Sequence, residues 1–377
     1  MDIGIPKETF MGEDRLALSP LAVRTLAEHG HNVYIEGGAG LASNYQDAEF
    51  TQAGATVVFS HDEAFGRAQL VPKVQRPGPT ELDMLAEEQI LFSFLHLAAA
   101  REEHVRALVE KGITAIGYEI IEDDDGSLPI VRSFSEIAGH MCLQVAARCL
   151  EVQCGGRGIM LGGAPGVPPA EVVIIGAGNL GCSAAEAALG LGARVTLLDI
   201  NVSQLRRALR HIHCPIVTAT ATPGHVETAL GYADVLIMAV GVRHGGRAPM
   251  IVSRKMVRGM KAGAVIVDTA IDQGGSVETS RPTTIANPTF HEEGVVHYCV
   301  PNMTAAVPRT GSRVLANASL PYVLDIADEG LDASLLKQPP LARAVFIYRG
   351  NCCNSEIAEL FGLDYTPLSE LINNDKE

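Results

Sequence analysis

The segment Glu171-Val-Val-Ile-Ile-Gly176-Ala-Gly178-Asn-Leu-Gly181 decides the fold of this chain. A short β-branched run enters a GxGxxG loop and an alanine-rich helical pattern leaves it, which is typical of a dinucleotide-binding βαβ unit. Gly176 would allow the tight turn, Gly178 would let the backbone approach a pyrophosphate, and Gly181 would let the helix pack closely on its strand. We therefore predict a nucleotide site here rather than a glycine-rich packing turn. Its expected contacts are Gly176, Gly178, Asn179, Leu180 and Gly181.

The next predicted strand indicates which nucleotide binds. Ala193-Arg-Val-Thr-Leu-Leu ends at Asp199, at the spacing where a carboxylate accepts hydrogen bonds from the adenosine ribose. This carboxylate would repel the 2′-phosphate of NADP, so the sequence favours NAD. Arg206 and Arg207 follow and could in principle neutralise that phosphate. At that distance we expect them on the solvated face of the next helix.

Composition excludes several classes of protein. The 377 residues, 47% apolar and 19% charged, suffice for two domains with full cores. No apolar stretch approaches the ~20 uncharged residues of a membrane helix, and the N-terminus lacks the pattern of a signal peptide, so we expect a cytoplasmic protein. A net charge of −15 argues against nucleic acid or an anionic membrane as a partner.

Cysteine and histidine spacing does not indicate a metal site. The eight cysteines show no CxxC or zinc-ligand spacing, and most lie in apolar or helical runs, so we expect reduced core residues. The histidines are scattered, and no metal is expected.

The N-terminal part alternates short apolar strands with amphipathic helical patterns, which indicates a parallel, doubly wound sheet. The predicted strands cover residues 3–5, 33–36, 57–60, 70–74, 90–95 and 114–118, with a helix over 20–28. Gly37-Gly-Ala-Gly40 lacks the GxGxxG spacing and is predicted to be a turn. This part is therefore interpreted as a substrate domain.

A long helical pattern from Ser135 precedes a Gly/Pro-rich loop over residues 155–169. Later strands over 235–240 and 264–268 lead into small-residue loops over 241–246 and 269–275, and these loops are expected to face the nicotinamide. Beyond Pro308, helical patterns over 316–329 and 355–360 precede a polar tail that is expected to fray.

Together these patterns predict an α/β protein with two doubly wound, parallel-sheet, Rossmann-like domains. The NAD-binding domain, residues 131–307, would be inserted into a discontinuous substrate domain, residues 1–130 and 308–377.

Several segments carry a resemblance to a known family. They are Ile3-Gly-Ile-Pro-Lys-Glu8 with Arg15, Phe92-Ser-Phe-Leu-His-Leu97, the GxGxxG loop, Val267-Asp-Thr-Ala-Ile-Asp-Gln-Gly-Gly275, Ser280-Arg-Pro-Thr-Thr284 and Tyr298-Cys-Val-Pro-Asn-Met303. These segments, which follow one another in the family's order, resemble those of the NAD-dependent alanine dehydrogenases, and the resemblance extends from residue 1 to about residue 330. The nucleotide-binding subunit of proton-translocating transhydrogenases is a more distant relative. His96 and Asp272 favour the amino-acid enzyme over it.

The resemblance implies reversible oxidative deamination, in which hydride transfer from an amino acid to nicotinamide is followed by hydrolysis of the imine to a keto acid and ammonia. This chemistry needs a cation for the carboxylate, a group that titrates near neutral pH, and a polar group that orients water or ammonia. The resemblance also implies a homohexamer.

The resemblance assigns roles to three residues whose local sequence is ambiguous. Arg15 matches the carboxylate-binding arginine, although beside Glu13 and Asp14 it would otherwise be read as a surface residue. His96 follows an apolar strand and matches a general acid/base, although a lone histidine is more often a core residue. Asp272 would reach substrate or the nicotinamide ribose, with a structural cap as the alternative.

The remaining predicted contacts come from the same resemblance. Asn302 would bind substrate or cap a helix, and Ser135 would contact the cofactor or be an N-cap. Phe134 is a further predicted substrate contact, and Val240, Ile271, Asp272 and Met303 are further predicted cofactor contacts.

One departure from the family pattern bears on the substrate. The family's substrate-binding lysine falls two residues after Lys73, where this chain has Gln75. An amide donates hydrogen bonds but carries no charge, and a charge-assisted bond is roughly twice as strong. Along an extended strand Lys73 would point to the same side as Gln75, so it could take the place of the family's lysine. Arg76 could do so instead if Pro77 causes a bulge in the strand.

Smaller departures accompany it at Phe134, Gln204, Gly241 and Pro301, and together they suggest altered substrate choice. The predicted function is NAD-dependent oxidative deamination of L-alanine or a related small amino acid. The alternatives are an opine-like, NADH-dependent reductive condensation of an amine with a keto acid, and a non-catalytic NAD-binding homologue.

Overall fold

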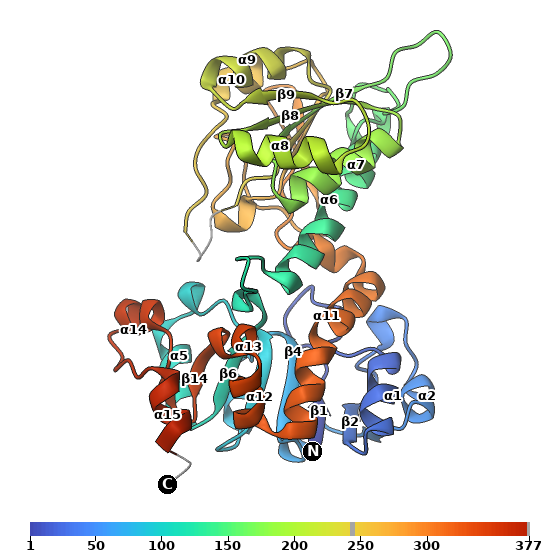
Figure 1. The fold of residues 1–377 in the computed structure, drawn as a ribbon. Coiled ribbons are helices and arrows are strands. Elements are labelled where there is room, and N and C mark those ends of the chain that lie inside the picture. Colours follow the sequence, from blue (N-terminus) through green and yellow to red (C-terminus); the bar gives the residue numbers. More distant parts are fainter. Residues whose placement is uncertain (242–245, 375–377) are drawn as a thin grey trace. The chain divides into compact units, whose positions relative to one another are not determined.

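The computed structural model describes residues 1–241 and 246–374, and the chain divides into two compact units (Figure 1). Unit 1 comprises Met1–Ser133 and Ala305–Glu377, and unit 2 comprises Phe134–Thr304. Residues 242–245 of the predicted loop 241–246 lie outside the described residues. No helix in the described part of the chain is long and apolar enough to cross a membrane.

Unit 1 is built on a sheet with the strand order β15-β14-β6-β5-β4-β1-β2-β3. The strands are β1 (Asp2–Ile5), β2 (Asn32–Glu36), β3 (Thr56–Val58), β4 (Leu70–Gln75), β5 (Ile90–Phe94), β6 (Thr114–Gly117), β14 (Val345–Tyr348) and β15 (Asn351–Cys352). Strands β1 to β6 are parallel, whereas β14 and β15 are antiparallel at one edge, so the predicted parallel sheet has an antiparallel border. The strand order reverses between β1 and β4, which is where open α/β sheets bind their ligands.

Several helices of this unit begin at strong local signals. At α1 (Pro20–Glu28), the Ser19 side chain accepts a hydrogen bond from the Ala22 backbone and Pro20 occupies the first turn. The others are α2 (Asp47–Gln52), α3 (His61–Gly66), α4 (Pro79–Met84), α5 (Glu102–Glu110), α11 (Pro308–Glu329), α12 (Leu331–Lys337), α13 (Pro339–Arg343), α14 (Ser355–Phe361) and α15 (Leu368–Asn374), with short 3₁₀ turns η1 (Leu41–Ser43), η2 (Leu97–Ala99) and η3 (Tyr118–Ile120). Helix α11 packs against α1 and η1 (Figure 1).

Unit 2 contains a second sheet, ordered β12-β13-β11-β10-β7-β8-β9. Its strands are β7 (Glu171–Ile175), β8 (Arg194–Asp199), β9 (Val217–Thr220), β10 (Val235–Met238), β11 (Val265–Asp268), β12 (Thr289–Glu292) and β13 (Val295–Tyr298). All pair in parallel except β12, which is antiparallel to β13. The order reverses between β10 and β7, so the GxGxxG loop after β7 lies at the second reversal point.

Helices cover both faces of this second sheet. They are α7 (Asn179–Gly190), α8 (Val202–His211), α9 (Pro223–Tyr232) and α10 (Arg254–Arg258), with 3₁₀ turns η4 (Val152–Cys154), η6 (Ile271–Gln273) and η7 (Met303–Ala306). Figure 1 shows α7 and α8 on one face and α9 and α10 on the other, as in a doubly wound fold.

Helix boundaries were the weakest part of the prediction. Helix α6 (Pro129–Cys149) begins six residues before the predicted Ser135, and α11 begins at Pro308 rather than at residue 316. In both cases a proline opens the helix, because its fixed φ suits the first turn and its missing N–H costs nothing there. The tail was predicted to fray, but its described part forms α15, in which Ile372 is buried.

All eight cysteines are free of disulfide bonds in the structure. Burial raises the pKa of several of these thiols, including Cys142, Cys149 and Cys299. The expectation of core positions is wrong for Cys214, which is exposed.

Candidate active site

Polar side chains of unit 1 gather where the adjacent strands β1 and β4 end. Glu8 lies in the segment that follows β1, and Lys73 and Gln75 lie in the last part of β4. The register of β4 against β5 shifts between Pro72 and Gln75. The regular alternation of side chains therefore fails at this point of the strand.

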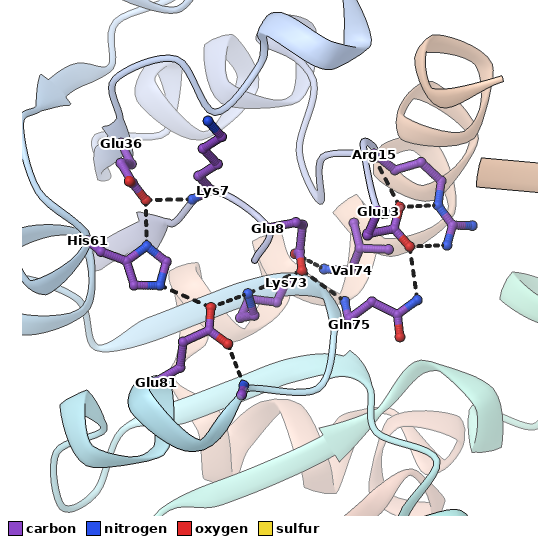
Figure 2. A network of polar contacts seen from close by, with 11 residues as sticks. Lys7, Glu8, Glu13, Arg15, Glu36, His61, Lys73, Val74, Gln75 and Glu81 are labelled. Carbon is purple, nitrogen blue, oxygen red and sulfur yellow. Dashed lines mark hydrogen bonds and ion pairs between the residues drawn. The ribbon is translucent and has the colours of Figure 1, made fainter. Parts of the chain in front are cut away.

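His61, at the start of α3, lies between two carboxylates (Figure 2). Its Nδ1 is 2.6 Å from Glu36 Oε2, and its Nε2 is 3.0 Å from Glu81 Oε1. Hydrogen bonds to Glu36 and then Glu81 raise the pKa of His61 to about 9, against the opposing effect of burial. Ionised carboxylates only accept hydrogen bonds, so His61 is held here as an imidazolium with both ring nitrogens protonated.

Lys73 continues this chain of alternating charges. Its side chain has no exposed area, and its Nζ is 2.8 Å from Glu81 Oε1 and 3.2 Å from Glu8 Oε2. Burial alone would lower the pKa of Lys73, but the charges of Glu8 and Glu81 raise it overall, so the ammonium stays charged. The prediction that Lys73 binds substrate in place of the missing lysine is not supported, because its head group is buried and held by two carboxylates.

Glu8 connects the ion pairs to the backbone of β4. Its Oε1 accepts a hydrogen bond from the Val74 backbone at 2.6 Å, and its Oε2 accepts one from the Gln75 backbone at 3.3 Å. Burial raises the pKa of Glu8, and Lys73 and the Val74 N–H offset this only in part. The carboxylate of Glu8 thus lies against the irregular end of the strand.

Arg15 is buried, with 3% of the residue exposed, and forms an ion pair with Glu13. Arg15 Nε is 2.6 Å from Glu13 Oε1 and Nη2 is 2.5 Å from Oε2, a bidentate arrangement. Gln75 Nε2 donates to the same carboxylate, 2.9 Å from Glu13 Oε2 (Figure 2). Burial alone would raise the pKa of Glu13, but the hydrogen bonds from Arg15 and Gln75 hold it below its usual value. The surface position that its neighbours indicated for Arg15 is therefore wrong.

His96 lies two residues after the end of β5 and is exposed. It adopts a left-handed backbone conformation, with φ 44° and ψ 47°. Glu119 from η3 accepts hydrogen bonds from the backbones of Leu95 and His96, at 3.2 and 2.6 Å. The imidazole stacks on Phe94, and Phe94 is the register partner of Gln75 in β4. The fold therefore brings His96 and Gln75 to neighbouring strand ends.

The GxGxxG loop has three glycines in three different situations. Gly176 has φ 108°, and a Cβ there would lie 2.3 Å from the Ala239 carbonyl oxygen. A Cβ on Gly181 would lie 1.8 Å from the Gly176 carbonyl oxygen, so helix and strand approach too closely for a side chain. A Cβ on Gly178 would meet nothing within 4 Å, so the loop is open there.

Asp199 ends β8 beside this loop. Its Oδ2 accepts a hydrogen bond from the Ala177 backbone at 2.6 Å, and its Oδ1 accepts one from Asn201 at 2.7 Å. These bonds fix the carboxylate at the carboxyl edge of the sheet. Arg206 and Arg207 are exposed on α8, as predicted.

The loop after β11 is held by a buried carboxylate. Asp268 is 1% exposed and accepts hydrogen bonds from the backbones of Ala270 and Ser276, at 3.1 and 3.0 Å. Within the loop, η6 contains the buried Ile271 and the exposed Asp272. Val240, which follows β10, is partly buried.

The other predicted contacts lie on α6 and around η7. Phe134 and Ser135 are inside α6, so the alternative reading of Ser135 as an N-cap is wrong. Asn302 has φ 51°, and its Oδ1 accepts a hydrogen bond from Thr304 Oγ1 at 3.1 Å. Met303 is buried, with its sulfur 3.9 Å from Cys142 Sγ.

Sequence reasoning missed several ionisable residues that organise these sites: Glu8, Glu13, Glu36, His61, Glu81, Glu119 and Asp268. Glu13 is only two residues from its partner Arg15, but the other residues of unit 1 are 8 or more residues from their partners, and no local spacing indicates those pairs. One signal was available for Asp268, because an acidic residue that ends an apolar strand must find donors nearby.

The geometry of unit 2 fits a dinucleotide. Among the described residues, no side chain caps the N-terminus of α7, so its first backbone N–H groups and the helix dipole can bind an anion. The open space at Gly178 would admit a pyrophosphate, and Asp199 lies where ribose hydroxyls would donate. In the described part of the chain, no group of three or more His, Cys, Asp or Glu side chains is arranged to hold a metal ion.

Comparison with protein families gives a match over most of the chain. Residues 4–138 match the family described as "Alanine dehydrogenase/PNT, N-terminal domain", and residues 142–355 match "Alanine dehydrogenase/PNT, C-terminal domain". An alanine dehydrogenase of Methanococcus maripaludis is 42% identical over 374 residues, which cover 99% of this chain and 100% of the relative. An alanine dehydrogenase of Mycobacterium tuberculosis is 44% identical over 366 residues, covering 97% and 98%.

Solved structures agree with these relatives. An L-alanine dehydrogenase superposes with a TM-score of 0.92 at 45% identity, covering 96% of this chain and 99% of that one. A transhydrogenase from Sinorhizobium meliloti superposes with a TM-score of 0.81 at 22% identity, covering 93% and 100%. This second likeness concerns the fold alone.

Proposed function

The chain belongs to the alanine dehydrogenase/PNT family and is an amino-acid dehydrogenase, and we propose that it oxidatively deaminates L-alanine or a related small amino acid with NAD. The products would be the corresponding keto acid and ammonia. The observation that carries the proposal is the similarity to alanine dehydrogenases over the full length, at 42% and 44% identity.

NAD is the proposed cofactor, bound by unit 2. When bound, it supplies the hydride acceptor for the α-carbon of the amino acid. The N-terminus of α7 would bind the pyrophosphate, and Asp199 would accept hydrogen bonds from the adenosine ribose. Val240, Ile271 and Met303 would contribute contacts near the nicotinamide, and Ser135 would contact the cofactor from α6.

Arg15 is the proposed anchor for the substrate carboxylate, because a guanidinium has five N–H donors in a fixed geometry and its bidentate contact with Glu13 uses only Nε and Nη2. Glu13 compensates the charge of Arg15 and orients it through two hydrogen bonds. Phe134 and Gln75 would be further substrate contacts. Gln75 brings no positive charge, so the carboxylate would depend on Arg15 more strongly than in a relative with lysine at this position.

His96 is the proposed general acid/base. Its imidazole would take a proton from the water that attacks the imine carbon and return one to the departing ammonia. Glu119 would act as a positioning residue, because its carboxylate holds the backbone of His96 in the left-handed conformation. Asp272 and Asn302 are proposed to orient water or ammonia during imine hydrolysis.

A steady-state assay with NADH, ammonium and a panel of small keto acids tests this function. NADH oxidation that requires both ammonium and a keto acid would support it. Oxidation only with a larger amine would instead indicate reductive condensation, and NADH binding without turnover would indicate a non-catalytic homologue. A parallel assay with NADPH tests the choice of cofactor. From family membership we also propose a homohexamer, which light scattering would test, and a cytoplasmic location.

A further inference from the structure

We propose that Glu8 is a positioning residue for the substrate site, which fixes the backbone at Gln75 and, through Gln75, the pair Glu13 and Arg15. The inference rests on the proposed function, since that function assigns Arg15 and Gln75 to substrate binding. It adds a residue that acts behind them, without contact to the substrate.

The first argument is the hydrogen bonding of β4. In a regular strand, successive backbone N–H groups point to opposite sides. Here the N–H groups of Val74 and Gln75 both end on the carboxylate of Glu8, at 2.6 and 3.3 Å. The register shift between Pro72 and Gln75 lies in the same place. Glu8 therefore accepts hydrogen bonds from the two backbone N–H groups at the irregular end of β4. The local shape of the strand depends on the two carboxylate oxygens of Glu8.

The second argument is what holds Glu8 itself. Lys73 binds both Glu8 and Glu81, and His61 binds both Glu81 and Glu36 (Figure 2). Glu36 Oε2 also accepts a hydrogen bond from the backbone of Lys7, at 2.8 Å. The network thus returns to Lys7, the residue before Glu8, and connects the segment after β1 with the end of β4.

Stability alone does not account for this network. Buried ion pairs lose much of their attraction to desolvation, and apolar residues of similar volume often serve stability as well or better. Lys73 and Glu81 are 0% and 1% exposed at their side chains, so the desolvation is nearly complete. What the network provides is a fixed place for the carboxylate of Glu8, as rigid support for binding residues requires.

The third argument is the path from Glu8 to the substrate site. Gln75 is held by its backbone to Glu8 and by its side chain to Glu13, and Glu13 binds Arg15. A shift of the Gln75 backbone would therefore move the carboxylate that orients Arg15. Arg15 would then hold the substrate carboxylate less well, and the loss should appear in the KM for the keto acid.

The substitution Glu8→Gln tests the proposal with little change in shape. Glutamine has a single acceptor oxygen, so one of the two β4 donors loses its acceptor. We expect the KM for the keto acid to rise about 10-fold or more, a change in binding rather than in chemistry, with unchanged affinity for NADH. Glu102→Gln is the matched control, since Glu102 forms an exposed ion pair with Arg106 in the same unit.

A double variant separates positioning from stability. Glu8→Gln with Lys73→Met removes both charges together, so its melting temperature should exceed that of Lys73→Met alone. Its KM should stay raised if Glu8 positions the site. A double variant with restored stability and a normal KM would overturn the proposal, and it also covers the case in which Glu8→Gln alone fails to fold.

Crystal structures of the variants provide a readout that does not need activity. We expect the contact between Gln75 Nε2 and Glu13 Oε2 to be lost or the register of β4 to change. If the contact and the register are both retained, the positioning role is refuted. Absence of turnover in the wild-type protein with every keto acid would refute the proposed function instead, and the structures would still decide the role of Glu8.

Discussion

Gln75 donates its side-chain amide to Glu13, with 2.9 Å between Gln75 Nε2 and Glu13 Oε2. An ionised carboxylate only accepts hydrogen bonds, so the amide nitrogen must face Glu13 and Gln75 Oε1 must face away from it (Figure 2). One donor of Gln75 thus serves the protein's own carboxylate, and its oxygen is an acceptor. A lysine at this position would present donors and a positive charge instead.

The substitution Gln75→Lys is therefore expected to raise kcat/KM for pyruvate in reductive amination by about 10-fold, equivalent to ~1.4 kcal/mol. The ammonium would keep a contact with Glu13 and add a charge-assisted bond to the keto acid. Gln75→Met is the matched control, because it has similar length and no donor, and its kcat/KM should fall. Unchanged kinetics in Gln75→Lys would show that position 75 does not decide how strongly the carboxylate is bound.

His96→Asn tests the acid/base role. Asparagine tolerates the left-handed conformation that His96 adopts, so the backbone should be retained. We expect kcat to fall by ~10² to 10⁴, the usual contribution of a general acid/base, with NADH affinity unchanged. His29→Asn, at an exposed histidine outside the site, is the control. A kcat within a few fold of wild type would exclude His96 as the proton carrier.

The nucleotide loop was predictable because its requirements are local. The motif requires a tight turn at Gly176, an open approach at Gly178 and close helix packing at Gly181. The contacts that a side chain would make at each position agree with these requirements. The predicted strands agree with the observed ones within two residues at either end, because buried parallel strands are continuous apolar runs. The two prolines that open α6 and α11 were underestimated as start signals.

The charge network was not predictable for the opposite reason. Lys73 and Glu8 are 65 residues apart, and only the pairing of β4 with β1 brings them together. Strand alternation would have put Lys73 and Gln75 on one side, but the register shift between them breaks that rule. A single sequence shows neither the shift nor the carboxylates that cause Lys73 to turn inward.

The protonation of His61 predicts a stability difference at alkaline pH. Its pKa is raised from 6.5 to about 9 in the folded protein, so the folded state binds more protons than the unfolded chain between these values. The stabilisation is therefore fully present below pH 6.5 and is lost as the pH rises through about 9. Allowing for partial solvent screening, we expect about 1–2 kcal/mol.

Denaturant unfolding of wild type and His61→Gln between pH 6 and pH 10 measures this difference. The free energy of unfolding should be higher for wild type at pH 6, and the two curves should converge near pH 10. Parallel curves across the range would mean that His61 does not change its protonation on unfolding.

Asp199→Asn tests the choice of nucleotide. The substitution removes the negative charge that would repel a 2′-phosphate and replaces one acceptor oxygen by a donor. We expect NADH affinity to fall by about 10- to 100-fold, as for loss of a charge-assisted hydrogen bond, while NADPH binding improves relative to NADH. Arg207→Gln on the exposed face of α8 is the control. If Arg207→Gln, rather than Asp199→Asn, changes the ratio of NADH to NADPH affinity, the arginine determines which nucleotide is preferred.

Gly178→Ala and Gly181→Ala form a matched pair that separates cofactor binding from packing. Gly178 has φ −75° and ψ −167°, which any residue adopts, and a Cβ there meets nothing within 4 Å. Gly178→Ala should therefore fold with an unchanged melting temperature. The new methyl group would occupy the path of the pyrophosphate, so NADH affinity should fall by about 10- to 100-fold.

Gly181→Ala should behave in the opposite way, because its Cβ would lie 1.8 Å from the Gly176 carbonyl oxygen. Relief of that overlap requires α7 to move from β7, at a cost of about 1–3 kcal/mol in unfolding free energy. Thermal unfolding and fluorescence titration with NADH measure both quantities for both variants. A Gly178→Ala protein that binds NADH normally would place the cofactor away from this loop, and the assignment of unit 2 as the nucleotide domain would fail with it.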